Sequence, residues 1–285
     1  MIKREDLRIR DPFILTDMEN NCYYMYGTTA LVENSIAAKN SFSVYKSLDL
    51  ENFEEAKIVV NGNKYNFWGT KDFWAAEVHK YNGKYYLFGS CKADGKCRGT
   101  HIFVCDTPDG EFVPVSPTPA TPLDWECLDG TLYVEDGVPY IVFCHEWLQV
   151  GDGEICAQKL SQDLSTPIGD PFLLFHASDN KNVTEIASPK GELGVGSGNY
   201  VTDGPFLFKE DGKLKMIWSS FSNGRYLVLE AVCKGEKLSD GWEHHGSRFE
   251  FDGGHAMLFN CLDGTRMISL HRPNSLNARP TFIEF

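Results

Sequence analysis

The sequence repeats one short unit five times, and this repetition constrains the fold more than any other feature. Each copy has an apolar strand opened by a small polar motif, then a turn, then a second apolar strand. The copies begin at residues 11, 77, 129, 203 and 255, so the steps between them are 66, 52, 74 and 52 residues. Recurrence of this kind is typical of propellers. We therefore expect an all-β, five-bladed β-propeller with one domain over residues 1–285, although a two-sheet sandwich also explains alternating strands.

Four of the five units carry a glycine-containing turn between their paired strands. These turns are Asn82-Gly83, Asp136-Gly137, Asp211-Gly212 and Asp263-Gly264. Both central residues of a type I′ turn need a positive φ angle, which Asn, Asp and Gly adopt most readily. The sequence therefore predicts a tight hairpin in each of these units.

Composition narrows the possible partners and compartments. The 40 acidic and 27 basic residues give a net charge of -13, which would repel phosphate backbones and makes nucleic acid a poor partner. Nothing approaches the roughly 18 consecutive apolar residues of a membrane span, and no apolar signal segment opens the sequence. The 9 cysteines are scattered without a CxxC pair, so neither a zinc site nor a disulfide framework is indicated. We expect a reducing, cytoplasmic location without membrane contact.

Four acids and one histidine open the five units. The first strand of each propeller blade lies nearest the central axis, so these opening residues should meet at one end of the channel. They are Asp11, Glu77, Asp129, Asp203 and His255. Crowded carboxylates raise one another's pKa, and such a cluster is costly unless a function or a cation uses it. Glycoside hydrolysis uses one ionised and one protonated carboxyl group, which this cluster could supply.

The second strand of each unit runs back towards the acidic cluster. Its end should therefore bring Glu146, Trp147 and Arg272 to the same site. Trp74 and Trp147 could stack on sugar rings at the rim, although each tryptophan in such strands is more typical of a packed core. We expect Trp74, Glu77, Trp147 and Arg272 to contact the substrate. A salt bridge, for instance to Arg272, is the structural alternative for Glu146.

An ordered set of motifs covers nearly the whole chain. They are Arg10-Asp11-Pro12, Trp74-Ala-Ala-Glu77-Val-His79, Leu128-Asp129-Gly130, Thr202-Asp203-Gly204-Pro205, Gly254-His255 and Arg279-Pro280. This set resembles glycoside hydrolase family 43. The resemblance implies a five-bladed propeller that hydrolyses arabinofuranosides and xylosides from plant polysaccharides with inversion.

The resemblance also implies a role for each matched residue. Asp11 matches the general base that activates water, and Asp129 matches the aspartate that orients the acid and tunes its pKa. His255 matches a histidine that in several members helps to hold calcium, so calcium at the axis is expected but no organic cofactor. The family's general acid is a Glu in a Glu-Gly-Pro motif, and Asp203 occupies that position here. The Asp-Pro of the third blade is Asp129-Gly130 in this chain.

The shorter side chain at position 203 leaves three interpretations. Asp203 could still be the acid, Glu146 could replace it, or the protein could have lost hydrolysis. We expect an inverting α-L-arabinofuranosidase or arabinan-type glycosidase acting on oligosaccharides, with the base and acid about 6.5–9.5 Å apart. The alternatives are a β-xylosidase or other furanosidase of the family, and a non-catalytic sugar- or metal-binding propeller.

Overall fold

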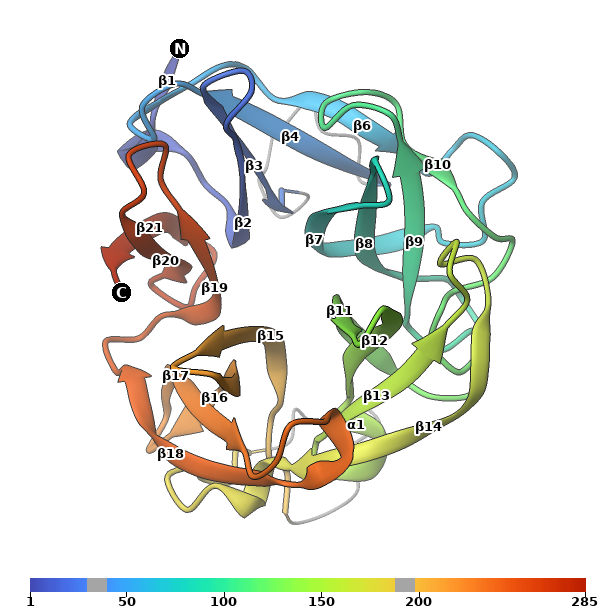
Figure 1. Cartoon of the computed structure of the whole chain (residues 1–285), viewed down its shortest axis with the longest axis vertical. Helices are drawn as coiled ribbons and strands as arrows, with labels where there is room; N and C mark the ends of the chain where they lie inside the picture. The colour runs from blue at the N-terminus through green and yellow to red at the C-terminus, as the bar shows by residue number, and fades with distance from the viewer. Residues whose placement is uncertain (30–39, 188–197) are drawn as a thin grey trace.

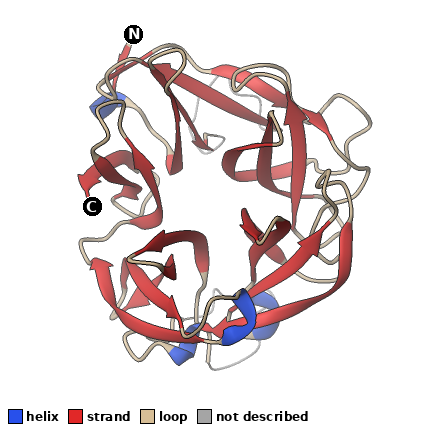
Figure 2. Ribbon diagram, in the orientation of Figure 1, coloured by secondary structure: helices blue, strands red, loops and turns tan. Residues whose placement is uncertain are grey.

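Five antiparallel sheets stand around a central axis in the computed structural model, which describes residues 1–29, 40–187 and 198–285 (Figure 1). In four of the sheets the first strand lies nearest the axis and the later strands follow outwards; in the N-terminal sheet the second strand is innermost and the first lies at the outer edge. Strands make up nearly all of the regular structure, and the described residues contain one α-helix, α1 (Trp147–Val150) (Figure 2). This arrangement confirms the predicted single-domain, all-β, five-bladed propeller.

Each blade is built from strands that follow one another in the chain. Blade 1 holds β1 (Ile2–Lys3), β2 (Arg10–Asp17), β3 (Cys22–Thr28), β4 (Ser41–Ser47), β5 (Asn52–Phe53) and β6 (Lys57–Asn61). Blade 2 holds β7 (Lys71–Tyr81), β8 (Lys84–Lys92), β9 (Gly99–Cys105) and β10 (Val113–Pro114). Blade 3 holds β11 (Cys127–Glu135), β12 (Val138–His145), β13 (Glu154–Leu160) and β14 (Pro167–His176).

The last two blades complete the ring. Blade 4 holds β15 (Asp203–Glu210), β16 (Lys213–Ser222), β17 (Arg225–Cys233) and β18 (Trp242–Phe249). Blade 5 holds β19 (Gly254–Asn260), β20 (Arg266–Arg272) and β21 (Arg279–Glu284). Short 3₁₀ turns lie at η1 (Arg4–Asp6), η2 (Ala177–Asp179) and η3 (Leu238–Asp240).

Three of the four predicted turns have both central residues at positive φ, as type I′ requires. These pairs are Asn82-Gly83, Asp136-Gly137 and Asp211-Gly212. The prediction is wrong for the fourth turn, where Gly264 has a φ of 88° but Asp263 is not among the positive-φ residues. Here Cys261 N–H bonds to the carbonyl of Thr265, so the loop is wider than a two-residue turn.

The ring closes between blades 5 and 1 without a shared strand, because β1 pairs with β5 of its own blade. The Ile9 N–H donates to the carbonyl of Ala278 at 3.3 Å, and side chains make further contacts across the junction. The Thr16 hydroxyl donates to the carbonyl of Asn260 at 2.7 Å, and the Ser269 hydroxyl donates to the carbonyl of Pro12 at 2.7 Å. These contacts hold β2 against blade 5 and so fix the position of the residues that open β2.

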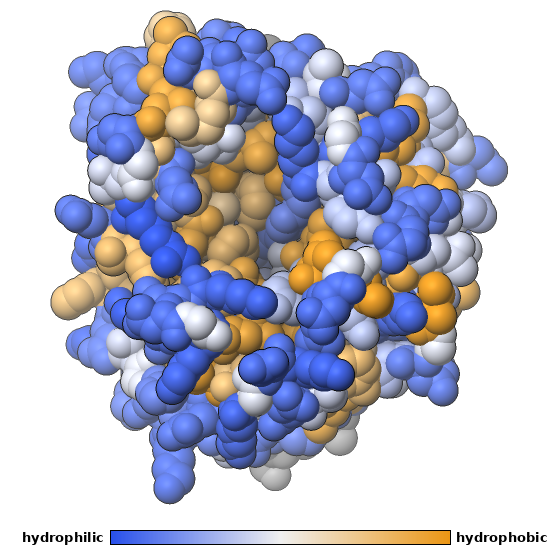
Figure 3. Space-filling model, viewed as in Figure 1, coloured by the Kyte–Doolittle hydropathy of each residue, from blue (hydrophilic) through white to orange (hydrophobic). Residues whose placement is uncertain are grey.

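Apolar side chains fill the spaces between blades. All seven residues of β3 are buried, because this strand has neighbouring strands at its edges and adjacent layers on both faces. Apolar residues also surround the hollow at the centre of the face shown in Figure 3. Within the described residues, no helix is long and apolar enough to cross a membrane.

Candidate active site

A β-bulge opens every innermost strand. The pairing register shifts at the start of β2, β7, β11, β15 and β19, and one residue at each shift has a positive φ between 49° and 56°. These residues are Asp11, Ala75, Asp129, Gly204 and His255; β7 has a second shift, at which Asp72 has a φ of 55°. The structure therefore corrects the predicted equivalence of Glu77 and Asp203 with the other three openings, because the bulges align Ala75 and Gly204 with them instead.

Hydrogen bonds from the preceding blade hold four of these bulges. In each case the bulge N–H donates to a side chain near the end of a second strand. The pairs are Ala75 to Thr28 Oγ1 (2.7 Å), Asp129 to Ser90 Oγ (2.9 Å), His255 to Ser219 Oγ (2.8 Å) and Asp11 to His271 Nδ1 (3.2 Å). Positive φ is strained for residues other than glycine, so these bonds stabilise the conformation that brings Asp11, Asp129 and His255 together.

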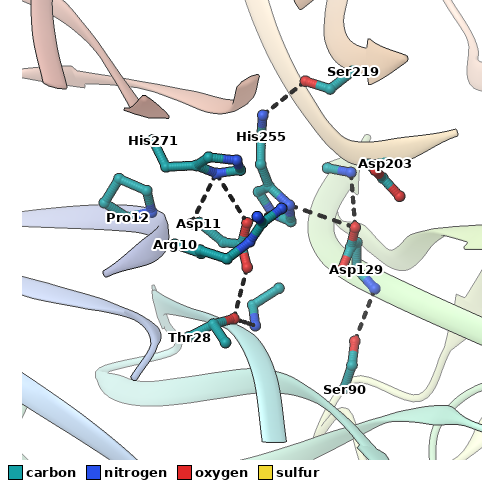
Figure 4. Close-up of polar contacts among 12 residues, drawn as sticks. Arg10, Asp11, Pro12, Thr28, Ser90, Asp129, Asp203, Ser219, His255 and His271 are labelled. Carbon is teal, nitrogen blue, oxygen red and sulfur yellow. Dashed lines mark hydrogen bonds and ion pairs between the residues drawn. The ribbon is translucent and has the colours of Figure 1, made fainter. Parts of the chain in front are cut away.

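Asp11 is held as a carboxylate by its neighbours (Figure 4). The Thr28 hydroxyl donates to Oδ2 at 2.6 Å, and Oδ1 lies 3.3 Å from His255 Nδ1 and 3.2 Å from His271 Nδ1. Burial alone would raise the pKa of Asp11, but His255 and His271 outweigh burial and hold it far below its ordinary value. An ionised carboxylate of this kind can accept a proton from water.

Asp129 lies between Asp11 and blade 4. Its Oδ2 is 3.5 Å from His255 Nδ1 and accepts a hydrogen bond from the Gly204 N–H at 3.0 Å. Burial raises the pKa of Asp129 to about 6, despite the opposing effect of His255. A side chain at position 204 would collide with the His255 ring, because a Cβ there would lie 2.8 Å from two ring carbons. Glycine is therefore required where blades 4 and 5 meet.

Asp203 has the opposite protonation preference from Asp11. Burial raises its pKa to about 7, and the neighbouring Asp129 carboxylate adds to the increase. Its Oδ2 accepts a hydrogen bond from the Tyr226 hydroxyl at 2.9 Å. At neutral or lower pH this carboxyl group can therefore hold a proton and donate it.

Glu146 forms a buried ion pair on the pocket wall. Its Oε2 lies 3.5 Å from Nε of Arg98, whose side chain is 5% exposed. The Arg98 guanidinium stacks over the Trp74 ring, 3.8 Å from the ring centre. Burial raises the pKa of Glu146 to about 7, against the lowering effect of Arg98. The salt bridge proposed as the structural alternative exists, but its partner is Arg98 and not Arg272.

These side chains enclose a cavity of about 260 Å³ at the axis. Its walls combine acids, an imidazole, a phenol and apolar surface. The lining residues are Arg10, Asp11, Thr28, Trp74, Leu128, Asp129, Glu146, Asp203, Tyr226 and His255.

A family model of glycosyl hydrolases family 43 matches residues 6–284. The chain belongs to family 43. It is 41% identical to an endo-arabinase from Bacteroides thetaiotaomicron, with a TM-score of 0.89 over 100% of this chain and 96% of that one. A thermostable family-43 glycoside hydrolase is 24% identical, with a TM-score of 0.78 over 97% of this chain and 89% of that one.

An endo-1,4-beta-xylanase from Bacteroides thetaiotaomicron shares the fold at 23% identity, with a TM-score of 0.73 over 98% of this chain and 91% of that one. The comparison with curated proteins gave no match. Family 43 membership makes this chain a glycosidase. The predicted family and enzyme class are therefore confirmed, and the non-catalytic alternative is not supported.

Three expected substrate contacts do not line the cavity of this family 43 enzyme. Glu77 is buried in the channel, where its carboxylate lies 3.0 Å from His79 Nε2. Arg272 is exposed and lies near the rings of Phe249 and Phe251, because successive strand residues point to opposite sides and its neighbour His271 takes the inner side. Trp147 begins α1 and is partly exposed, outside the cavity lining.

Four residues that contribute to this family 43 site were not predicted: Arg10, Thr28, Arg98 and Tyr226. The sequence held a signal for Thr28. This residue ends the second strand of its hairpin, and Ser90 and Ser219 are hydroxyl residues near the ends of the corresponding strands in their blades. Arg98 and Tyr226 lie on loops or third strands, where the repeat gave no equivalent polar position to compare.

The calcium expected at His255 has a weak donor set here. Calcium prefers six to eight oxygen ligands, whereas His255 offers nitrogen and its Nδ1 already faces two carboxylates. The residues described contain no group of three or more His, Cys, Asp or Glu side chains placed to hold a metal ion. Calcium binding at the axis stays a prediction that these side chains do not favour.

Proposed function

We propose that this family 43 glycosidase hydrolyses α-L-arabinofuranosyl linkages with inversion, using Asp11 as the general base and Asp203 as the general acid. Asp129 orients the acid and influences its pKa. The substrate class is supported by the 41% identity to a protein described as an endo-arabinase. A β-xylosidic substrate is the second candidate, because enzymes of that type share the fold.

One observation carries the assignment of acid and base. Two carboxyl groups in one cavity have pKa values displaced in opposite directions, with Asp11 far below its ordinary value and Asp203 raised to about 7. Pairs of titratable groups separated in this way identify the base and the acid. The histidines beside Asp11 and the burial of Asp203 are the physical causes.

The proposed reaction is a single displacement. Asp11 takes a proton from water as the water oxygen attacks the anomeric carbon. The glycosidic C–O bond breaks, and the proton on Asp203 passes to the leaving oxygen. This geometry needs space for water between base and sugar, for which inverting enzymes place the two carboxyl groups about 6.5–9.5 Å apart.

Asp203 is preferred over Glu146 because of their partners. Asp203 is hydrogen-bonded to a neutral phenol and lies beside Asp129, which bonds to the adjacent Gly204 N–H. Glu146 faces the guanidinium of Arg98. Burial raises the pKa of both groups to about 7, so their partners and not their pKa values separate them. An ion pair favours the charged carboxylate, whereas a general acid must be protonated before the reaction. We assign Glu146, together with Trp74, to the sugar-binding wall.

A panel of chromogenic glycosides tests this proposal. Wild type should hydrolyse α-L-arabinofuranoside, and Asp11→Asn should lose at least about a hundredfold in kcat, a typical loss for a general base. Proton NMR of a reducing-end oligosaccharide digest should show the β-anomer of arabinofuranose before mutarotation. Immediate appearance of the α-anomer, or full activity of Asp11→Asn, would contradict the proposed mechanism. Turnover of xyloside alone would change the proposed substrate to a xyloside, but it would leave the proposed roles of Asp11 and Asp203 unchanged.

A further inference from the structure

We propose that Tyr226 is a positioning residue that fixes the transferable proton of Asp203 on Oδ1. This inference rests on the proposed role of Asp203 as the general acid. Tyr226 lies on β17, the third strand of blade 4, and its side chain reaches the cavity between Asp203 and blade 5.

The direction of the hydrogen bond decides which oxygen carries the proton. The Tyr226 hydroxyl donates to Asp203 Oδ2 at 2.9 Å. Burial, and then the nearby carboxylates, raise the pKa of Tyr226 well above its ordinary value, so the phenol keeps its proton. A protonated carboxyl group has one hydroxyl and one carbonyl oxygen. Since Oδ2 accepts from the phenol, the acidic hydrogen belongs on Oδ1.

The fold holds the phenol in place. The Tyr226 ring stacks on His271 with centroids 5.6 Å apart and an interplanar angle of 18°, and Phe221 packs at 5.0 Å. Residue 254 must be glycine, because a Cβ there would lie 2.4 Å from Tyr226 Cε1. His271 in turn contacts Asp11. One stacked pair of rings therefore locates both carboxyl groups of the proposed mechanism.

The bond should strengthen during the reaction. As the glycosidic bond breaks, the Oδ1–H proton moves to the leaving oxygen and Asp203 becomes a carboxylate. A hydrogen bond to a charged acceptor is stronger than one to a neutral acceptor. The Tyr226 bond therefore stabilises the transition state more than the ground state, which raises kcat. It also limits the rotation of an acid that is one methylene shorter than the Glu of the family motif.

The decisive variant is Tyr226→Phe, compared on two substrates of the sugar that wild type accepts, first α-L-arabinofuranose. An oligosaccharide has a poor leaving group and needs the acid, whereas a 2,4-dinitrophenyl glycoside needs little protonation. Tyr226→Phe should lower kcat on the oligosaccharide about ten- to a hundredfold, the effect of losing a hydrogen bond to a charged group. It should leave kcat on the dinitrophenyl glycoside within about threefold of wild type.

Tyr26→Phe is the matched control. Tyr26 is fully buried and its hydroxyl donates to the carbonyl of Pro108 at 2.5 Å, away from the cavity. This variant should keep both activities. Gly254→Ala keeps the Tyr226 phenol but displaces its ring, so it should reproduce the selective loss of activity on the oligosaccharide. This variant provides a second test if Tyr226→Phe folds poorly.

Equal losses on both substrates, or no loss on the oligosaccharide, would overturn the role of Tyr226. Asp203→Asn, measured in parallel, separates this outcome from failure of the proposed function. If Asp203→Asn loses oligosaccharide activity while Tyr226→Phe keeps it, only the inference about Tyr226 is wrong. If Asp203→Asn keeps that activity, the assignment of the acid itself is wrong.

Discussion

The Gly204 N–H donates to Oδ2 of Asp129 at 3.0 Å, where every other blade junction uses a side chain from a second strand. At this junction the corresponding strand position is Cys144, which pairs with Leu128 as Ser90 pairs with Trp74. Sulfur is a weak hydrogen-bond acceptor. The carboxylate of Asp129 therefore accepts the N–H that a serine or threonine hydroxyl or a histidine accepts at the other junctions. This hydrogen bond draws the Asp129 carboxylate towards β15, the strand that begins with Asp203.

Cys144→Ser should weaken this contact, because a hydroxyl at the position could accept the Gly204 N–H itself. We expect kcat/KM to fall about tenfold, the typical effect of one displaced hydrogen bond. Cys144→Ala is the matched control, since it removes the sulfur without adding an acceptor and should stay near wild type in activity. Equal activity of the Ser and Ala variants would contradict this explanation.

Thr28 connects two elements of the site with one hydroxyl. Its Oγ1 accepts the Ala75 N–H and donates to Asp11 Oδ2. Thr28→Val keeps the shape but leaves both groups unpaired, so the free energy of unfolding should fall by about 1–3 kcal/mol and kcat should fall as well. Thr28→Ser keeps the hydroxyl and should retain most activity. Urea denaturation and steady-state kinetics measure the two effects, and a fully active, fully stable Val variant would refute the role of the hydroxyl.

The pH profile of kcat/KM should show a single fall in activity, near neutral pH. Asp11 has a pKa far below its ordinary value, so the base stays ionised across the accessible range. The pKa of Asp203 is about 7, so activity should fall as the pH rises above this value and the acid loses its proton. Because Asp203 and Asp129 interact, the measured value belongs to the pair. Activity that instead rises through pH 7 would contradict the assignment.

Stability should change with pH for the same physical reason. A carboxyl group whose pKa is raised in the folded state favours folding when protonated, and this contribution is lost as pH rises towards the folded pKa, about 7 for Asp203. Asp203→Asn removes that ionisation. The variant should therefore melt at least about 2 °C above wild type at pH 8, with a smaller difference at pH 5. Calorimetry at both pH values provides the measurement. A variant that melts below wild type at pH 8, but not at pH 5, would contradict this account.

The repeat predicted the fold because strand alternation and Asn-Gly or Asp-Gly turns are local signals. Asn82-Gly83 forms its tight turn with contacts between neighbouring residues alone. The wider loop at Asp263 differs because Asn260 pairs with Arg266, which leaves five residues between the strands instead of two. Local motifs also identified Asp11 and Asp129 as site residues, because each lies in a short motif at the start of its strand.

The remainder of the site depends on long-range geometry. A bulge shifts the register of β7, so Ala75 and not Glu77 has the position equivalent to Asp11. Arg98 reaches Glu146 from a different blade, across 48 residues of sequence. Tyr226 contacts Asp203 from the third strand of its blade. None of these relationships has a sequence spacing that could have indicated it.

The central claim is that Asp203, and not Glu146, donates the proton to the leaving group. Its most direct test compares Asp203→Asn with Glu146→Gln on an arabino-oligosaccharide and on a dinitrophenyl arabinofuranoside, with folding checked by circular dichroism. The account predicts that Asp203→Asn loses at least about a hundredfold in kcat on the oligosaccharide. It should retain most activity on the dinitrophenyl substrate, and Glu146→Gln should show no such selectivity. A leaving-group-selective collapse of Glu146→Gln, with Asp203→Asn still active on the oligosaccharide, would contradict the claim.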